Sequence, residues 1–360
     1  MVEFGVPQGS ILGPTLFNLY INDLHDFCIN TKIIQFADDT CVLISEKSRD
    51  SLAKSITNAM NKINFWLMVN NLMLNVDKTK ILEINLRNVV RDPLSIKSHC
   101  CVSPLIAEQS SIALRQPSQD DGVVDPRLSF FSLASSSFNV ILNCCCPVVT
   151  EASNYIYLGV IFQQNLKWDL HVSKMIKKLR SSSVLLYKLR NVSTVHFRRA
   201  VYYSFIHSQL KYGILLYGAT YHSTVNPIVV LQKKCLRNVY GMSYLDSTSQ
   251  LWREKSMLHF YAIYAYSAVM YAMKWKIHIG KSSNNAYITR FAAKECFSHY
   301  LVKLAINNSL LSHRLVNIKK AHPDLFDVNL DSSSYLLIKH KTKEYLCKIT
   351  PDSLKRCILL

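Results

Sequence analysis

Residues 33–44 read IIQFADDTCVLI, and this stretch decides the fold. Its two short runs, Ile33–Phe36 and Cys41–Ile44, consist mostly of β-branched or bulky apolar residues. Between them lies ADDT (37–40), a short acidic segment of the kind that favours a tight turn. Two such runs joined by a turn predict a β-hairpin with the acidic pair at its tip.

The turn of this hairpin carries two adjacent carboxylates, Asp38 and Asp39. Neighbouring side chains of a strand point to opposite faces, but at a turn this alternation lapses and both can project from one end. Two close carboxylates repel each other unless a cation or a proton relieves them. Magnesium prefers carboxylate oxygens and shares its shell with phosphates, which favours a two-ion phosphoryl-transfer site. The alternative is that Asp-Asp serves only to form the turn.

A second motif, GVPQGS (5–10), precedes a predicted helix. Gly9 allows close approach of the backbone, and Ser10 can cap the helix, whose exposed amide groups would suit a phosphate or a base edge. Taken alone, the motif is equally a turn followed by a cap. Downstream, Lys78 could donate a proton to leaving pyrophosphate or pair with its charge, although most lysines are solvated surface residues.

Apolar periodicity predicts the elements around the hairpin. Residues 11–24 have helical spacing, and Pro14 suits the first turn of that helix. The expected buried face of this helix consists of Leu12, Leu16, Leu19, Tyr20 and Leu24. Residues 51–68 return to a helical period, whereas residues 72–76 and 81–86 are predicted as strands.

Residues 87–153 break this pattern, because they contain many serines, five cysteines and no sustained period. So long a stretch without secondary structure is improbable as an ordinary connection in a compact domain. We therefore expect an irregular, disordered insertion, to which the residues assign no function.

The pattern resumes at Tyr155–Phe162, a strand-like run broken by Gly159. Helices are predicted over residues 170–190, 196–217 and 228–240, with basic groups at Arg198, Arg199, Lys211, Lys233, Lys234 and Arg237. The first of these helices is amphipathic, with Val172, Met175, Ile176 and Leu179 on its apolar face and Lys174, Lys177, Lys178 and Arg180 pointing away from it. The apolar stretch Leu258–Met273 is shorter than the roughly 20 residues that a bilayer requires, so it is predicted to be a buried core helix. Residues 276–360 are weakly patterned and are expected to be helical or irregular.

The chain of 360 residues has a formal net charge of +18, and the excess is uneven. Residues 1–92 carry 9 Lys and Arg against 10 acidic residues, residues 93–153 carry 3 against 5, and residues 154–360 carry 30 against 9. The expected partner of so basic a part is a polyanion, nucleic acid first and an anionic membrane second. A solubilising charge without a partner is the alternative. The eleven cysteines include no C-x-x-C pair, so no structural zinc site is expected.

The order of the motifs along the chain helps to choose among the roles that each motif alone leaves open. The segments GVPQGSILGPTLFNLYINDL, FADDT, FxxWLxxNxLxLNxDKTK and YLGVIF follow one another along the chain. This combination resembles the reverse transcriptases of non-LTR (LINE-type) retrotransposons, most of all those of jockey-type elements. The resemblance covers residues 4–86 and 154 to about 275. It implies an α+β right-hand polymerase, with a partial palm over residues 1–86 and the end of the palm and a basic helical thumb over residues 154–275.

The resemblance also implies roles for individual residues. Asp38 and Asp39 would be two of three carboxylates that hold two Mg²⁺ (or Mn²⁺) ions, and Lys78 would lie near the phosphates. The nucleotide and template site would be formed by Pro7, Gln8, Gly9, Ser10, Phe36 and Ala37, and the nucleic-acid backbone would be contacted by Lys174, Lys177, Lys178 and Arg180. The implied partners are an RNA template, a DNA primer and deoxynucleoside triphosphates. Neither a membrane nor a stable protein partner is expected, and neither nucleus nor cytoplasm is favoured.

Two departures from the family pattern keep alternatives open. The third carboxylate belongs to an earlier palm strand, and only four residues precede Gly5. Residues 87–153 also separate segments that the family joins by a shorter link. The expected function is therefore that of a fragment of an RNA-directed DNA polymerase, and the alternatives are a catalytically dead nucleic-acid-binding remnant or a relic without function.

Overall fold

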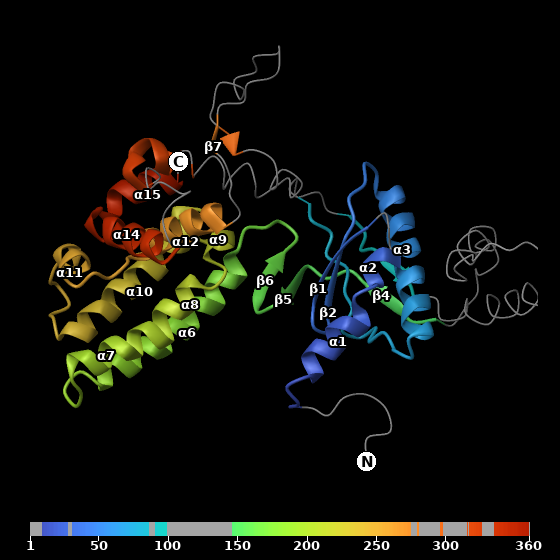
Figure 1. Ribbon diagram of the computed structural model, residues 1–360, viewed down its shortest axis with the longest axis horizontal. Helices are drawn as coiled ribbons and strands as arrows, with labels where there is room; N and C mark the ends of the chain where they lie inside the picture. Colours follow the sequence, from blue (N-terminus) through green and yellow to red (C-terminus); the bar gives the residue numbers. More distant parts are fainter. Residues whose placement is uncertain are drawn as a thin grey trace, which may run out of the picture. The chain divides into compact units, whose positions relative to one another are not determined.

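The structure is a computed structural model, shown in Figure 1. It describes residues 9–27, 31–85, 91–98, 146–274, 279–280, 296–297, 315, 317–325 and 335–359. The chain divides into two compact units, Met1–Leu166 and Lys167–Leu360. Among the described residues helices predominate, and the strands form small antiparallel pairs. The predicted α+β class is confirmed.

The first unit begins with α1 (Gly13–Ile21) and α2 (Leu24–Phe27), which replace the single helix predicted over residues 11–24. Pro14 lies in the first turn of α1, as expected. The predicted buried face of this helix is wrong, except for Leu24. The side chains of Leu12, Leu16, Leu19 and Tyr20 are exposed, whereas those of Phe17, Ile21 and Leu24 pack into the core. Because α1 is apolar on more than one side, spacing alone did not select the side that packs.

Strands β1 (Lys32–Phe36) and β2 (Asp39–Leu43) form the predicted hairpin, with Phe36 paired to Asp39. Directly opposed residues of an antiparallel pair share one face of the sheet. The opposed pair Ile33 and Val42 packs against the core of the unit, which is formed by Ile21, Leu24, Ile63 and Trp66. The hairpin therefore has an inner face on this core and an outer face that includes Phe36 and Asp39.

Helix α3 (Arg49–Val69) covers the segment predicted over residues 51–68. It is capped by Ser48, whose hydroxyl oxygen accepts a hydrogen bond from the Ser51 backbone N–H at 3.2 Å. Residues 72–76 and 81–85 do not form the predicted strands; Ile81 makes one isolated bridge to Glu151. The backbone groups of these two segments form hydrogen bonds in local turns and single hydrogen bonds to other segments. One example is the bond from the Asn85 N–H to the Gln164 carbonyl oxygen at 2.9 Å.

The ends of the predicted insertion differ from the irregular structure expected there. Strand β3 (Ser95–Lys97) pairs with β4 (Val148–Thr150), and the opposed residues Ile96 and Val149 are only 4% and 1% exposed. Glu151 accepts a hydrogen bond from the Leu94 backbone N–H at 2.7 Å. The two ends of the predicted insertion are thus joined by a strand pair with buried apolar residues, which we call the ordered base of the insertion. The intervening residues 99–145 lie outside the described part of the chain.

The run Tyr155–Phe162 is a second hairpin, made by β5 (Asn154–Tyr157) and β6 (Val160–Gln163). The two residues of its turn, Leu158 and Gly159, have φ angles of 47° and 80°. Type I′ turns require positive φ at both central positions, which explains why the strand-like run breaks at the glycine.

The second unit is built from helices. The helix predicted over residues 170–190 is present at Asp169–Lys188, the one predicted over 196–217 is divided into shorter segments between Val195 and Tyr217, and the one predicted over 228–240 begins earlier, at His222. Its elements in the described residues are α6 (Asp169–Lys188), α7 (Val195–Tyr202), the π-helix η1 (Tyr203–His207), α8 (Ser208–Lys211), α9 (Ile214–Tyr217), α10 (His222–Tyr240), α11 (Ser249–Glu254), α12 (Phe260–Lys274), α14 (Tyr335–Lys348) and α15 (Pro351–Leu359). Short elements β7 (Ile279–Gly280), β8 (Cys296–Phe297) and a 3-10 turn, Pro323–Leu325, complete them.

Two groups of helices pack together in this unit. Helices α6 and α10 lie along each other, and α14 and α15 pack against α12 (Figure 1). Helix α12 is the core helix predicted from Leu258–Met273, since Phe260, Ile263 and Val269 are fully buried. No helix in the described ranges is long and apolar enough to cross a membrane.

Candidate functional site

The turn of the β1–β2 hairpin places the two acidic residues at its tip. Ala37 has a φ of 50°, and Asp39 pairs directly with Phe36, so Ala37 and Asp38 are the two residues of the turn. Two-residue turns that match the twist of a hairpin need positive φ at their first central position. Asp38 thus projects from the turn itself, and Asp39 opens strand β2.

Asp39 lies on the outer face of the hairpin, together with Cys41 two residues further along β2. Both residues act electrostatically on Tyr157 of β5: the pKa of the Tyr157 hydroxyl is raised by burial, then by Cys41 and then by Asp39. The Tyr157 hydroxyl oxygen is shielded from solvent and has no hydrogen-bond partner among the described residues. The Tyr157 hydroxyl group is therefore within electrostatic range of Asp39.

Both carboxylates are available to a cation. Asp38 and Asp39 are exposed, and neither forms an ion pair with a described lysine or arginine. Adjacent carboxylates of this kind offer the oxygen ligands that Mg²⁺ and Mn²⁺ prefer. Within the described ranges, no third His, Cys, Asp or Glu joins them to make a larger cluster. The pair fits a divalent cation as a partial ligand set.

Lys78 is tied to the same hairpin, β5–β6. Its side chain is exposed, and its backbone N–H donates to Asn75 Oδ1 at 3.1 Å in the turn after α3. The hydroxyl group of Tyr155 donates to the Lys78 carbonyl oxygen at 3.3 Å. Tyr155 and Tyr157 are two residues apart on β5, so both point to one side of a strand that bonds to the Lys78 segment.

The glycine-rich motif is only partly described. Gly9 has a φ of 85°, a conformation that glycine adopts without strain. The hydroxyl oxygen of Ser10 accepts a hydrogen bond from the Gly13 backbone N–H at 3.0 Å, but the N-cap residue of α1 is Leu12, so Ser10 lies just before the cap position predicted for it. Pro7 and Gln8 lie outside the described residues. Phe36 and Ala37 are exposed beside the acidic pair, as a role near a primer end would require.

The basic face predicted for residues 170–190 is present on α6. Val172, Met175 and Leu179 are at most 5% exposed, whereas Lys177, Lys178 and Arg180 are exposed and Lys174 is half-buried. Burial lowers the pKa of His171 on the inner side of this helix, and Lys174 and Lys178 lower it further. The role of these cations in binding a nucleic-acid backbone stays a prediction.

Comparisons with known proteins bear on the first unit. Residues 1–162 match the family described as reverse transcriptase (RNA-dependent DNA polymerase), and the unit itself ends at Leu166. Over these residues, which are a little less than half of the chain, the sequence is similar to a reverse transcriptase domain.

Curated relatives extend this domain's likeness into the second unit. The RNA-directed DNA polymerase from mobile element jockey of Drosophila melanogaster is 23% identical over 263 residues, 70% of this chain and 24% of the relative. The probable RNA-directed DNA polymerases from transposon BS and from transposon X-element of the same species are 23% and 22% identical, over 71% and 70% of this chain and 24% and 23% of their own lengths. The chain spans about a quarter of the relatives it matches, and no solved structure matches it. It is homologous to the polymerases of these non-LTR retrotransposons.

Sequence reasoning missed two features of this reverse transcriptase homologue. The tyrosines of β5 were predicted only as part of a strand, although the alternation in YIY places Tyr155 and Tyr157 on one side. Arg198 was counted among the basic groups, but it is 5% exposed and donates to the carbonyl oxygens of Val239 and Arg190, each at 2.8 Å, and of Ser193. Its charge is therefore used inside the fold rather than on the surface.

Proposed function

We propose that this chain supplies the acidic hairpin and a basic helical unit of an RNA-directed DNA polymerase. The substrates would be an RNA template, a DNA primer and deoxynucleoside triphosphates, as the names of the relatives suggest. The observation that carries the proposal is the adjacent pair Asp38 and Asp39, exposed at the tip of a hairpin inside a reverse transcriptase domain.

The reaction joins the primer 3′-oxygen to the α-phosphorus of the incoming nucleotide, with loss of the hydroxyl proton and departure of pyrophosphate. Asp38 and Asp39 would hold Mg²⁺ or Mn²⁺, which when bound activates the attacking oxygen and stabilises the leaving group. Lys78 would neutralise or protonate the departing pyrophosphate. Its backbone is fixed by the hydrogen bonds from Tyr155 and to Asn75, so the flexible part is the side chain alone.

Phe36 and Ala37 would contact the primer end. Their position supports this role, because both are exposed next to the carboxylates that the primer hydroxyl must reach. Gly9 and Ser10, with Pro7 and Gln8, would line the pocket for the template base and the nucleotide. The positive φ of Gly9 leaves its backbone open to close approach by a base or a sugar.

In the second unit, Lys174, Lys177, Lys178 and Arg180 would contact the phosphates of the template–primer duplex. The exposed side of α6 supports this role, since its cations project opposite the buried face. Affinity for a duplex should then fall steeply with salt, because each phosphate contact releases counterions.

A second candidate function is nucleic-acid binding without catalysis. One observation supports nucleic-acid binding as such: Lys177, Lys178 and Arg180 are exposed on α6 of the second unit. The basic surface of the second unit would remain functional in that case.

Primer extension separates the two functions. The full chain is incubated with poly(rA)–oligo(dT), dTTP and Mg²⁺ or Mn²⁺, beside the double variant Asp38→Asn/Asp39→Asn. The proposal predicts metal-dependent incorporation that the double variant lacks, at a slow rate if two carboxylates act alone. Equal signals from both proteins, with retained binding of the duplex, would support binding without catalysis instead.

A further inference from the structure

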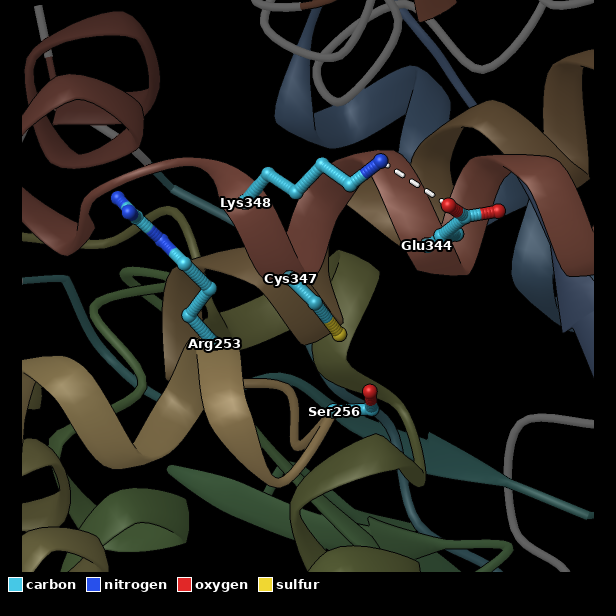
Figure 2. A pocket seen from close by; sticks show the side chains of 5 residues that line it. All are labelled: Arg253, Ser256, Glu344, Cys347 and Lys348. Carbon is cyan, nitrogen blue, oxygen red and sulfur yellow. Dashed lines mark hydrogen bonds and ion pairs between the residues drawn. The ribbon is translucent and has the colours of Figure 1, made fainter.

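A cavity of about 500 Å³ lies in the second unit between α11 and α14. Its lining residues are Arg253, Ser256, Glu344, Cys347 and Lys348 (Figure 2). Ligand sites commonly occupy about 300–1,000 Å³, so this volume accommodates a group the size of a nucleotide. None of these residues belongs to the acidic hairpin or to α6.

The charge of the lining favours an anion. Arg253 projects from α11 with no ion-pair partner in the described part of the chain, and Lys348 pairs with Glu344 at 3.0 Å (Figure 2). Cys347 adds no negative charge, because burial raises the pKa of its thiol. The exposed hydroxyl group of Ser256 supplies a further hydrogen-bond donor.

More cations surround the cavity. Lys343 lies one helical turn before Cys347 on α14 and lowers the pKa of its thiol, against the larger effect of burial. Helix α14 itself exposes Lys339, Lys341, Lys343 and Lys348 against one acidic residue, Glu344. A partly enclosed pocket with an arginine at its wall and lysines around it is a setting that attracts phosphate.

We propose that this pocket binds a phosphate group of a single nucleic-acid strand, with Arg253 as its main ligand. The planar guanidinium group can donate two parallel hydrogen bonds to phosphate oxygens. The Lys348 ammonium group points towards Glu344 and away from Arg253 (Figure 2), so it adds positive charge near the pocket rather than a second ligand. Glu344 limits the affinity, because it holds Lys348 in an ion pair and places a carboxylate in the lining. The proposal does not depend on chemistry at Asp38 and Asp39.

The test is binding of a short fluorescein-labelled single-stranded RNA to the full chain, followed by anisotropy at physiological salt. Arg253→Gln should weaken binding about tenfold, in line with the loss of hydrogen bonds to a charged group. Arg253→Lys keeps the charge but loses the paired donors, so it should also weaken binding. Lys47→Gln removes an exposed positive charge of the first unit and is the matched control, for which little change is expected.

Replacing the carboxylate of Glu344 should change the RNA affinity in the opposite direction. Glu344→Gln should tighten RNA binding, whereas Glu46→Gln, which removes an exposed carboxylate of the first unit, should not. RNA affinity that is unchanged in Arg253→Gln and Arg253→Lys would overturn the proposal. Stabilisation by inorganic phosphate that Arg253→Gln abolishes, with no effect on RNA, would also overturn it and would assign the pocket to a free phosphate.

Discussion

The hydroxyl group of Tyr155 donates a hydrogen bond of 3.3 Å to the main-chain oxygen of Lys78, across 77 positions of sequence. Two residues further along the same strand, the shielded hydroxyl group of Tyr157 lies near Asp39 and finds no partner among the described residues. One strand, β5, therefore bonds to the Lys78 segment and lies within electrostatic range of Asp39.

The two tyrosines make a matched pair for mutation. Tyr155→Phe should lower the free energy of unfolding by about 1 kcal/mol, the typical net worth of one intramolecular hydrogen bond. Tyr157→Phe should leave it unchanged or raise it, because the lost hydroxyl group is already unsatisfied. Urea denaturation of both variants checks this, and a larger loss for Tyr157→Phe than for Tyr155→Phe would mean that Tyr157 has an unrecognised partner.

Arg198 is expected to be essential for stability of the second unit. Its guanidinium group is buried and donates to three carbonyl oxygens, so Arg198→Ala should cost about 3 kcal/mol or more by leaving buried acceptors unsatisfied. Arg198→Lys should also destabilise, because an ammonium group cannot reproduce the fork of donors. Thermal denaturation measures both. Arg180→Ala, on the exposed side of α6, should change stability by no more than about 0.5 kcal/mol, and an equal effect at the two arginines would contradict the assignment.

The ordered base of the insertion predicts which deletion is tolerated. Removing residues 99–145 and joining Ser98 to Cys146 by a short turn should preserve stability, because the Ser98 N–H already bonds the Pro147 carbonyl at 2.9 Å. Removing residues 89–150 should lower the melting temperature, because it deletes β3 and β4 with the buried Ile96 and Val149. If the two deletions melted alike, the β3–β4 pair would not contribute to the core.

Two histidines, His259 in the core and the partly buried His207, predict a loss of stability in mild acid. Burial lowers the pKa of His207 and of His259 from 6.5 to about 4 in each case. Between these values the unfolded chain binds more protons, so the free energy of unfolding should fall as the pH drops from 6.5 towards 4, by about 1.4 kcal/mol per pH unit for each group. Urea denaturation at several pH values should show a shallower slope for His207→Gln and His259→Gln. An unaltered slope in both would show that neither ring is buried in its neutral form.

The sequence predicted the features of the fold that depend on residues close together in the chain, and missed those that depend on distant residues. The hairpin around Asp38 and Asp39, the amphipathic α6 and the buried α12 were all predictable, since periodicity and turn chemistry act over a few residues. The packed face of α1 was not, because its choice between two apolar sides depends on contacts with residues such as Ile63 and Trp66, far along the chain.

The candidate site shows the same difference between local features and features that depend on distant residues. The acidic pair and the bond of Ser10 to the first turn of α1 could be predicted from motifs, whereas the bond from Tyr155 to Lys78 and the burial of Arg198 depend on tertiary contacts. Strand β3 was missed because three residues carry too little pattern to be recognised without their partner β4. The pocket beside Arg253 joins α11 to a helix about ninety positions later, which no local pattern reveals.

The central claim is that Asp38 and Asp39 together bind a divalent cation. Titration of the full chain with Mn²⁺, with free Mn²⁺ followed by electron paramagnetic resonance, tests it most directly. We predict that wild type binds Mn²⁺, that Asp38→Asn and Asp39→Asn each weaken this binding, and that the double variant loses it. Asp23→Asn, an exposed carboxylate beside α2, is the matched control and should bind as wild type does. Equal Mn²⁺ binding by wild type and the Asp38→Asn/Asp39→Asn double variant would contradict the account.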